Sequence, residues 1–254
     1  ARLGARLLHR TTRKVSLTLD GQALLERASD LVDDMLDLEQ RFRPSSEGVE
    51  GRLRVEAPSR IARRVIAPAL PALLAQHPGL EIELRSSDRV VDLVQEQVDC
   101  ALRVGPLADS SLVARPLGMM PLMNCASPAY LARCGVPRTP ADLAQHQVVQ
   151  YLSPTSGRAA PWEWMDGEHE RSLLLAGPVG VNNAEGYIAC ALAGLGLIQI
   201  PRYDVRAHLQ AGELVEVLPD YLPVAMPVHV LDPHRTHVSR RVRVFIDWSA
   251  QLLL

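Results

Sequence analysis

The spacing of apolar residues changes its period along the chain. Apolar and polar residues alternate over 15–19, which predicts a short strand. Apolar residues then recur every three or four positions over 24–42, which predicts a long helix. From residue 52 to the end, short apolar runs alternate with segments of helical spacing. Strands that alternate with helices predict an α/β fold whose sheets are mainly parallel.

The long helix has clear start and stop signals. Thr18 offers a side-chain oxygen as N-cap, Asp20 places a negative charge in the first turn, and Pro44 ends the helix. One alternative is an amphipathic helix packed on its own domain. The breaks on both sides and the alternating spacings of four and three favour a heptad seam between two protomers. The members of this seam are Leu24, Ala28, Leu31, Met35, Leu38 and Phe42.

The region after residue 51 divides into two series of elements. Ligands of such α/β folds lie outside the carboxyl ends of the strands. We expect two lobes, lobe I over about 52–147 and 225–254 and lobe II over about 148–224. Strands are predicted over 52–57, 80–85, 100–104, 148–152, 173–175, 179–181, 197–200 and 227–231, and helices over 61–76, 91–97, 184–193 and 238–253.

Charge is divided unevenly between segments. Residues 1–14 carry five basic residues and no acidic one, whereas residues 20–50 carry nine acidic residues and three arginines. The formal net charge of −2 conceals this division. A basic β-ribbon with hydroxyl side chains can lie along DNA phosphates, and a solvated surface is the alternative. The ribbon residues are Arg10, Thr11, Thr12, Arg13 and Lys14.

Composition excludes several classes of protein. The 254 residues are 47% hydrophobic and 22% charged, which is typical of one or two globular domains. Four scattered cysteines indicate a reducing cytoplasm, and no run of 18 apolar residues is present to span a membrane. The sequence has no nucleophile elbow, phosphate loop or dinucleotide motif, and His234 and His237 lack a third ligand. We therefore expect no enzyme, no cofactor and no metal.

Several segments resemble one protein family. The segment ARLGARLLHRTTRKVSLTLDGQALLERA is similar to the end of the winged helix-turn-helix and the linker helix of LysR-type transcriptional regulators. The family's effector-binding domain is similar, in order and spacing, to GRLRVEAPSR, HPGLEIELRSSDRVVDLVQEQVDCALRVGPLADSSLVARPLG, ASPAYLARCGVPRTPADLAQH and ALAGLGLIQIP. The resemblance covers essentially the whole chain.

The resemblance implies a domain order and a set of partners. It implies an α/β, two-lobed periplasmic-binding-protein-like effector domain over 52–254, preceded by a hinge over 44–51. A linker and dimerisation helix over 19–43 and a partial winged helix-turn-helix over 1–18 come before it. It further implies DNA binding, a small and often anionic effector between the lobes, and a homodimer or homotetramer. Because Ala1 begins in mid-pattern, we expect the recognition helix to be missing and DNA binding by this chain to be weak and non-specific.

The candidate effector residues follow the ends of predicted strands. The serines and asparagines among them have a helix cap or a turn as the alternative. Arg60, Arg63 and Arg64 make the first helix of lobe I basic, which suggests an anionic effector, and a solvated helix face is an almost equal alternative. The candidates are Pro58, Ser59, Arg60, Ser86, Ser87, Arg103, Gly105, Ser127, Asn182, Asn183 and Pro201.

Two functions remain open at this point. The favoured one is a transcriptional regulator controlled by a small ligand. The alternative is a solute-binding protein that uses the same two lobes without DNA. The first fifty residues separate the two, because an exported binder would show a signal peptide where this chain shows a basic ribbon and a heptad helix.

Overall fold

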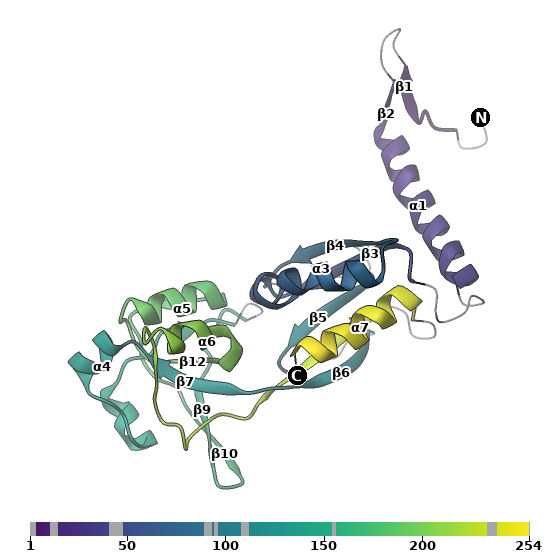
Figure 1. The fold of residues 1–254 in the computed structure, drawn as a ribbon. Helices are drawn as coiled ribbons and strands as arrows, with labels where there is room; N and C mark the ends of the chain where they lie inside the picture. Colours follow the sequence, from purple (N-terminus) through teal and green to yellow (C-terminus); the bar gives the residue numbers. More distant parts are fainter. Residues whose placement is uncertain are drawn as a thin grey trace.

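Three parts follow one another along the chain (Figure 1). A ribbon and a long helix come first, and the chain then enters lobe I, crosses to lobe II and returns to lobe I. Among the described residues, no helix has the length and apolar character that a membrane crossing needs. The computed structural model describes residues 4–10, 15–40, 48–88, 93, 96–107, 112–153, 156–232 and 238–253.

The N-terminal part forms a hairpin and the expected helix. Strand β1 (Leu8–Arg10) pairs antiparallel with β2 (Val15–Leu17), and α1 spans Leu19–Gln40. The Thr18 hydroxyl oxygen accepts a hydrogen bond from the Gly21 N–H at 3.0 Å, so the predicted N-cap is confirmed. At position 21 an added Cβ would lie 1.9 Å from the carbonyl oxygen of Leu7, so only glycine fits. The ribbon residues 11–14 and the seam residue Phe42 lie outside the described residues.

Lobe I is built on a five-stranded sheet in the order β4-β3-β5-β14-β6. Strand β3 is parallel to β4 and β5, whereas β14 is antiparallel to β5 and β6. The sheet is therefore mixed, because β14 enters it on the way back from lobe II. The other strands run toward lobe II and carry their carboxyl ends there. The bounds are β3 Gly51–Ala57, β4 Leu80–Ser86, β5 Cys100–Val104, β6 Val113–Met120 and β14 Met226–Asp232.

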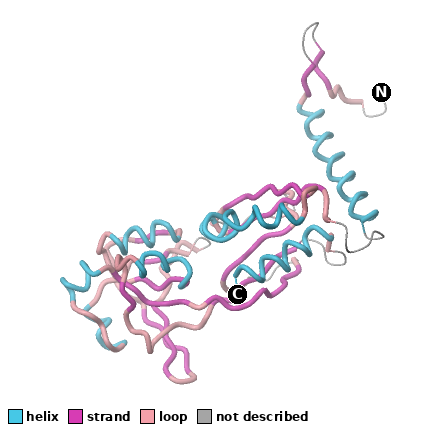
Figure 2. Tube along the Cα trace, in the orientation of Figure 1, coloured by secondary structure: helices cyan, strands magenta, loops and turns pink. Residues whose placement is uncertain are grey.

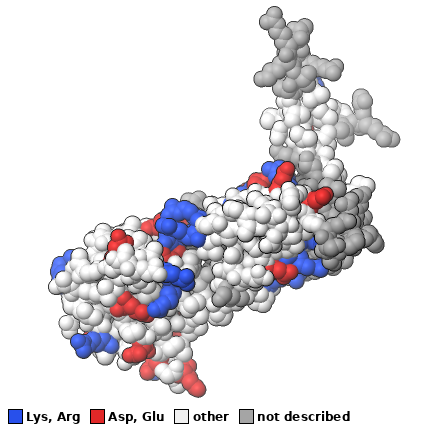
Figure 3. All heavy atoms as spheres, viewed as in Figure 1, with Lys and Arg blue, Asp and Glu red and all other residues white. Residues whose placement is uncertain are grey.

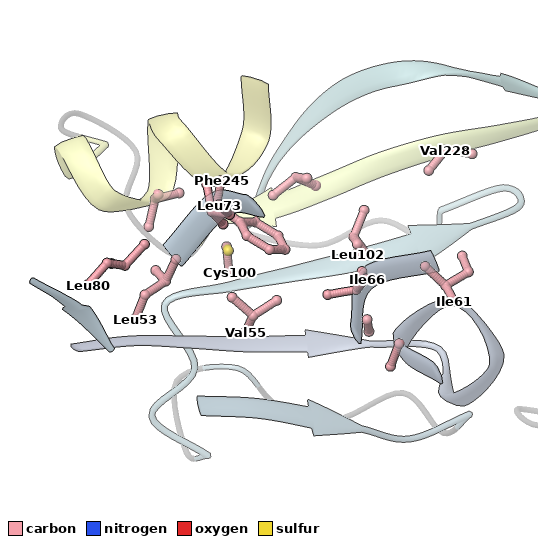
Figure 4. Packing of buried hydrophobic residues seen from close by; sticks show 14 of the residues in the cluster. Leu53, Val55, Ile61, Ile66, Leu73, Leu80, Cys100, Leu102, Val228 and Phe245 are labelled. Atoms are coloured by element: carbon pink, nitrogen blue, oxygen red, sulfur yellow. The ribbon is translucent and has the colours of Figure 1, made fainter. Parts of the chain in front are cut away.

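Helices on one face of this sheet enclose the core of lobe I (Figure 2). Residues 59–76 form one helical run, in which a π-helical turn η1 (Ala62–Ile66) separates α2 (Ser59–Ile61) from α3 (Ala67–Gln76). The last helix, α7, spans Arg240–Leu253. Figure 4 shows Leu73 of α3 and Phe245 of α7 directed toward the strands, and the labelled core also includes Leu53, Val55, Ile61, Ile66, Leu80, Cys100, Leu102 and Val228.

Lobe II contains smaller sheets. Its main sheet has the order β12-β7-β13, and both outer strands are antiparallel to β7, so the expectation of mainly parallel sheets is wrong here. The strands are β7 Leu122–Ala126, β8 Gln150–Tyr151, β9 Trp162–Asp166, β10 His169–Leu173, β11 Gly180–Val181, β12 Ile198–Pro201 and β13 Val215–Glu216. The helices are α4 Pro128–Cys134, the 3-10 helix η2 Pro140–Gln145, α5 Ala184–Leu192 and α6 Arg202–Gln210.

The boundary between the lobes lies earlier than the sequence suggested. Residues 122–147 were expected in lobe I, but β7 pairs with β12 and β13. Tyr130 and Leu143 pack in one core cluster with Trp162. Lobe II therefore begins with β7 directly after Pro121, the residue that follows β6, and the chain returns to lobe I between β13 and β14.

Two of the predicted elements differ from the structure. The strand predicted over 173–175 is wrong, because Leu173 is the last residue of β10 and Leu175 follows it as a buried core residue. Burial of Leu175 therefore reflects packing and not a strand. The helix predicted over 91–97 falls on residues of which only 93, 96 and 97 are described, and these lie in turns.

Candidate functional site

Charged side chains join the two lobes where the strands of lobe I end. Arg60 on α2 of lobe I forms ion pairs with Asp204 on α6 and with Glu185 on α5 of lobe II. Figure 3 shows charged side chains of both signs where the lobes meet, and Figure 1 shows α5 and α6 on the side of lobe II that faces α3. We name Arg60, Arg63, Glu185, Tyr203 and Asp204 the interlobe cluster.

The end of β3 positions Arg60. Pro58 adopts an extended conformation that directs the chain from β3 into α2. The Ser59 N–H donates a hydrogen bond to a carboxylate oxygen of Asp88 at 3.0 Å, and Asp88 follows the neighbouring strand β4. A carboxylate suits this place because a helix N-terminus carries a partial positive charge. The backbone N–H that the sequence suggested for an effector carboxylate is therefore already bound by Asp88.

Every nitrogen at the end of the Arg60 side chain has a partner in lobe II. Its Nε contacts Oδ1 of Asp204, and its Nη2 donates to the backbone carbonyl of Asp204. Its Nη1 lies 2.8 Å from Oε2 of Glu185. The side chains of Arg60 and Asp204 are only 5% and 3% exposed, whereas that of Glu185 is 42% exposed. Both carboxylates thus contact a buried guanidinium, but the Asp204 side chain is itself buried whereas the Glu185 side chain is partly exposed.

A second arginine contacts the same glutamate. Nη2 of Arg63, whose side chain is 60% exposed, forms an ion pair with Oε1 of Glu185. The two carboxylate oxygens of Glu185 are therefore shared between two guanidinium groups of lobe I. Two positive groups around one carboxylate make an arrangement that is suited to binding anions.

Burial makes ionisation of Asp204 unfavourable. It raises the pKa of Asp204 from 3.8 to about 6, although the Arg60 charge and hydrogen bonds from Arg60 and Tyr203 act in the opposite direction. Burial also raises the pKa of the Tyr203 hydroxyl, and the neighbouring Asp204 charge adds to this shift. Loss of hydration therefore outweighs the attraction within this buried pair.

The raised pKa of Asp204 predicts a pH-dependent stability. The folded protein holds the Asp204 proton more tightly than the unfolded chain, so this stabilisation is fully present below pH 3.8 and is lost as the pH rises to about 6. The free energy of unfolding of the native protein, relative to Asp204→Asn, should fall by about 3 kcal/mol between the two limits. Urea denaturation of both proteins over this pH range measures the difference.

The matched control for this series is Asp220→Asn, because Asp220 is an exposed aspartate of the same lobe. Its stability relative to the native protein should stay constant over the same pH range. A constant difference for Asp204→Asn would contradict the prediction.

Three further candidates lie next to the interlobe cluster. Asn183 is the N-cap of α5, where its side chain accepts a hydrogen bond from the Gly186 N–H at 2.8 Å, so the helix-cap alternative is confirmed. Asn182 is exposed and accepts a hydrogen bond from the Asn183 side chain. Pro201 ends β12 and directs the chain into α6. These residues set the start of the two helices that carry Glu185 and Asp204.

The remaining candidates lie elsewhere in the lobes. Arg103 pairs with Glu56 at 3.3 Å, and burial raises the pKa of Glu56 although Arg103 opposes the shift. Gly105 has a φ of +95° and donates its N–H to Pro227. Ser127 caps α4 inside lobe II, which confirms the helix-cap alternative for this serine. Ser86 is exposed at the end of β4, and Ser87 donates its N–H to the carbonyl of Ala57.

Sequence reasoning missed four residues at the junction: Asp88, Tyr151, Glu185 and Asp204. Glu185 and Asp204 stand in the first turns of their helices, where an acidic residue is expected for the helix dipole alone. Burial raises the pKa of the Tyr151 hydroxyl, and the charges of Asp88 and Asp204 add to this shift. Tyr151 of lobe II therefore lies near carboxylates from both lobes.

No metal site is present among the residues that the structure describes. These residues contain no group of three or more histidine, cysteine, aspartate or glutamate side chains that could hold a metal ion. His234 and His237 lie outside the described ranges. All four cysteines are free thiols.

The fold and the site define a ligand-binding module of two α/β lobes that follows a long helix. The LysR substrate binding domain matches residues 46–253. The chain belongs to the LysR family of transcriptional regulators, as the sequence resemblance predicted. Its C-terminal region is the effector-binding domain of such a regulator.

Relatives and solved structures agree on this class. The chain is 39% identical to the uncharacterized HTH-type transcriptional regulator YhjC of Escherichia coli, over 99% of this chain and 84% of that protein. It is 38% identical to an HTH-type transcriptional repressor of Pseudomonas aeruginosa, over 98% of this chain and 79% of that protein. These relatives are named as transcriptional regulators and not as solute-binding proteins or enzymes.

Two regulators with solved structures are similar to this chain. CrgA, a LysR-type transcriptional regulator from Neisseria meningitidis, is 28% identical with a TM-score of 0.71, covering 99% of this chain and 85% of that chain. AphB, a virulence activator of Vibrio cholerae, is 29% identical with a TM-score of 0.67, covering all of this chain and 86% of that chain. Regulators of this family bind DNA and small effectors and form oligomers.

Proposed function

We propose that a small organic anion controls this regulator by binding between the lobes, beside Arg60 and Arg63. The observation that carries the proposal is the pair of guanidinium groups from lobe I that already hold a carboxylate of lobe II. Arginines that only face solvent would not be expected to share one carboxylate, as Arg60 and Arg63 share that of Glu185. A carboxylate or phosphate group is the ligand that guanidinium pairs bind best.

Effector binding at this place would act on the relation between the lobes. Arg60 belongs to lobe I, whereas Glu185 and Asp204 belong to lobe II, so an anion that alters these contacts changes how tightly the lobes hold together. A ligand shifts such an equilibrium by its difference in affinity for the two arrangements. In a dimer joined through α1, this shift would change the spacing of the DNA-binding heads.

A thermal-unfolding series tests whether the effector is an anion. Small carboxylates, such as succinate and benzoate, should raise the unfolding temperature, since a ligand at about 100 times its Kd stabilises the native state by about 2.7 kcal/mol. The neutral amides succinamide and benzamide serve as matched controls of the same shape and should have no effect. Stabilisation by neutral or cationic compounds alone would overturn the proposal.

DNA contact is proposed for the ribbon that precedes α1. Arg10 ends β1, and Thr11, Thr12, Arg13 and Lys14 follow it outside the described residues. The support is the concentration of five basic residues in the first 14 and the DNA-binding class of the relatives. Each phosphate that these residues neutralise would make DNA affinity depend more strongly on salt.

Dimerisation is proposed through α1. The side chains of Leu31 and Met35 are 69% and 63% exposed, and Leu24 and Ala28 are also exposed in the single chain. Apolar side chains at heptad spacing become buried only when a second helix packs against them. A homodimer or homotetramer built on this seam fits the class of its relatives. The four free cysteines fit a protein that works in the reducing cytoplasm.

A further inference from the structure

We propose that Glu185 is an internal ligand of the effector site, and that a carboxylate effector binds by replacing Glu185 on Arg60 and Arg63. This inference rests on the proposed function, because it concerns the same site. It commits that function to one ligand class, a small molecule with at least one free carboxylate. It also gives Glu185 the role of an intramolecular competitor that sets effector affinity.

The contacts of Glu185 are those that a free carboxylate would make. One oxygen lies 2.8 Å from Nη1 of Arg60, and the other forms an ion pair with Nη2 of Arg63. Each oxygen thus contacts one nitrogen of a different guanidinium group, and guanidinium groups donate strong, charge-assisted hydrogen bonds to carboxylates. An effector carboxylate placed between the two arginines would therefore find its contacts already occupied by a group of the same chemistry.

Glu185 and Asp204 differ in how easily they can be replaced. The side chain of Glu185 is 42% exposed, whereas that of Asp204 is 3% exposed. Glu185 is the more accessible of the two carboxylates, so a small carboxylate can compete with it more easily than with Asp204. The buried Asp204 pair costs far more to break.

Asp204 keeps Arg60 in place during the exchange. It binds Nε through its side chain and Nη2 through its backbone carbonyl, which leaves Nη1 as the nitrogen that changes partner. The released Glu185 carboxylate can turn into solvent without leaving the first turn of α5, where the helix dipole still favours its charge. The exchange therefore requires no rearrangement of the buried pair.

Replacement of Glu185 removes one of the two lobe II residues that contact Arg60. Glu185 lies on α5 of lobe II, while Arg60 and Arg63 lie on the helical run of lobe I. When an effector takes its place, Asp204 on α6 is the lobe II carboxylate that remains on Arg60. Effector binding and the coupling between α5 and lobe I are thus linked through a single side chain.

Isothermal titration with succinate and with benzoate tests the inference on the full chain. Glu185→Gln removes the competing charge and should tighten carboxylate binding about threefold to fivefold. Glu185→Asp keeps the charge but shortens the side chain by one methylene, which draws it away from both arginines. This variant should also bind the carboxylates more tightly than the native protein.

The control variant is Glu213→Gln, since Glu213 is an exposed acidic residue of lobe II that pairs with His208. Its affinity for the carboxylates should equal that of the native protein. If Glu185→Gln binds carboxylates more tightly but Glu185→Asp binds them as the native protein does, the charge of Glu185 repels the effector without occupying its contacts. This result would overturn the proposal that the effector replaces Glu185. Native-like affinity in both Glu185 variants would also overturn the proposed role of Glu185. The proposed function would still hold in that case, provided that the native protein binds the carboxylates. Failure of every form to bind either carboxylate would overturn the proposed function itself.

Discussion

Replacing Arg60 with alanine is expected to lower the free energy of unfolding by about 3–5 kcal/mol at a pH well above the pKa of Asp204. The substitution leaves the carboxylate of Asp204 without its cation at a position where it is 3% exposed. A buried charge without a partner is far more costly than a missing surface pair. Urea denaturation followed by circular dichroism measures the loss.

Two control variants separate this effect from a simple loss of charge. Arg63→Ala removes an arginine that is 60% exposed and also pairs with Glu185, and its cost should stay below about 1 kcal/mol. The double variant Arg60→Met with Asp204→Leu removes both buried charges and should recover most of the stability. A cost below about 1 kcal/mol for Arg60→Ala would contradict a buried pair at this place.

Placing glutamate at positions 31 and 35 is expected to separate the protomers of the oligomer. Leu31 and Met35 are 69% and 63% exposed on α1, so neither substitution disturbs the interior of the chain. In a helix pair, however, two added carboxylates would face an apolar seam on a helix that is already acidic, and they would be desolvated and repelled. Light scattering should report a molecular mass that falls to about half.

Val136→Glu with Val224→Glu is the control for this experiment. Both valines are exposed apolar residues of the effector domain, away from α1. The same number of added charges should leave the mass unchanged. An unchanged mass for the α1 variant would show that the protomers associate through another surface.

Many single elements could be predicted from the sequence. The strand predicted over 100–104 is β5, and the helix predicted over 184–193 is α5 apart from its last residue. The cap at Thr18 was also predicted. Each of these rests on residues within a few positions of each other, because the period of apolar residues and the capping side chain act locally.

The division into lobes could not be predicted from local pattern. The apolar run over 122–126 is typical of a buried strand, but the run itself does not specify whether β7 joins the sheet of β6 or that of β12. Helix α6 and the β9–β10 hairpin also escaped prediction. The pairing of β7 depends on residues that are distant in sequence, so its own apolar period does not identify its partner strands. The β9–β10 hairpin joins neighbouring segments, so its signal was local and was missed.

Only part of the candidate site could be predicted, again because its contacts join residues that are distant in sequence. Arg60 and the neighbourhood of Asn183 and Pro201 were named because residues after strand ends gather at one edge of an α/β sheet. Asp204 and Glu185 were missed because acidic residues in a first helical turn have an ordinary explanation. A pair of opposite charges has no sequence signature when its members come from different lobes.

The sequence by itself determined the family, the order of the parts and the start of α1, because motifs, caps and apolar periods are local properties of the chain. Only the tertiary structure decided that Arg60 is buried against Asp204, 144 residues away, and that Glu185 bridges Arg60 and Arg63. The residue types alone show that these groups can carry a charge. Their desolvation and pairing exist only once the two lobes have folded against each other, and these two effects set both the pKa of Asp204 and the proposed exchange of Glu185 for an effector.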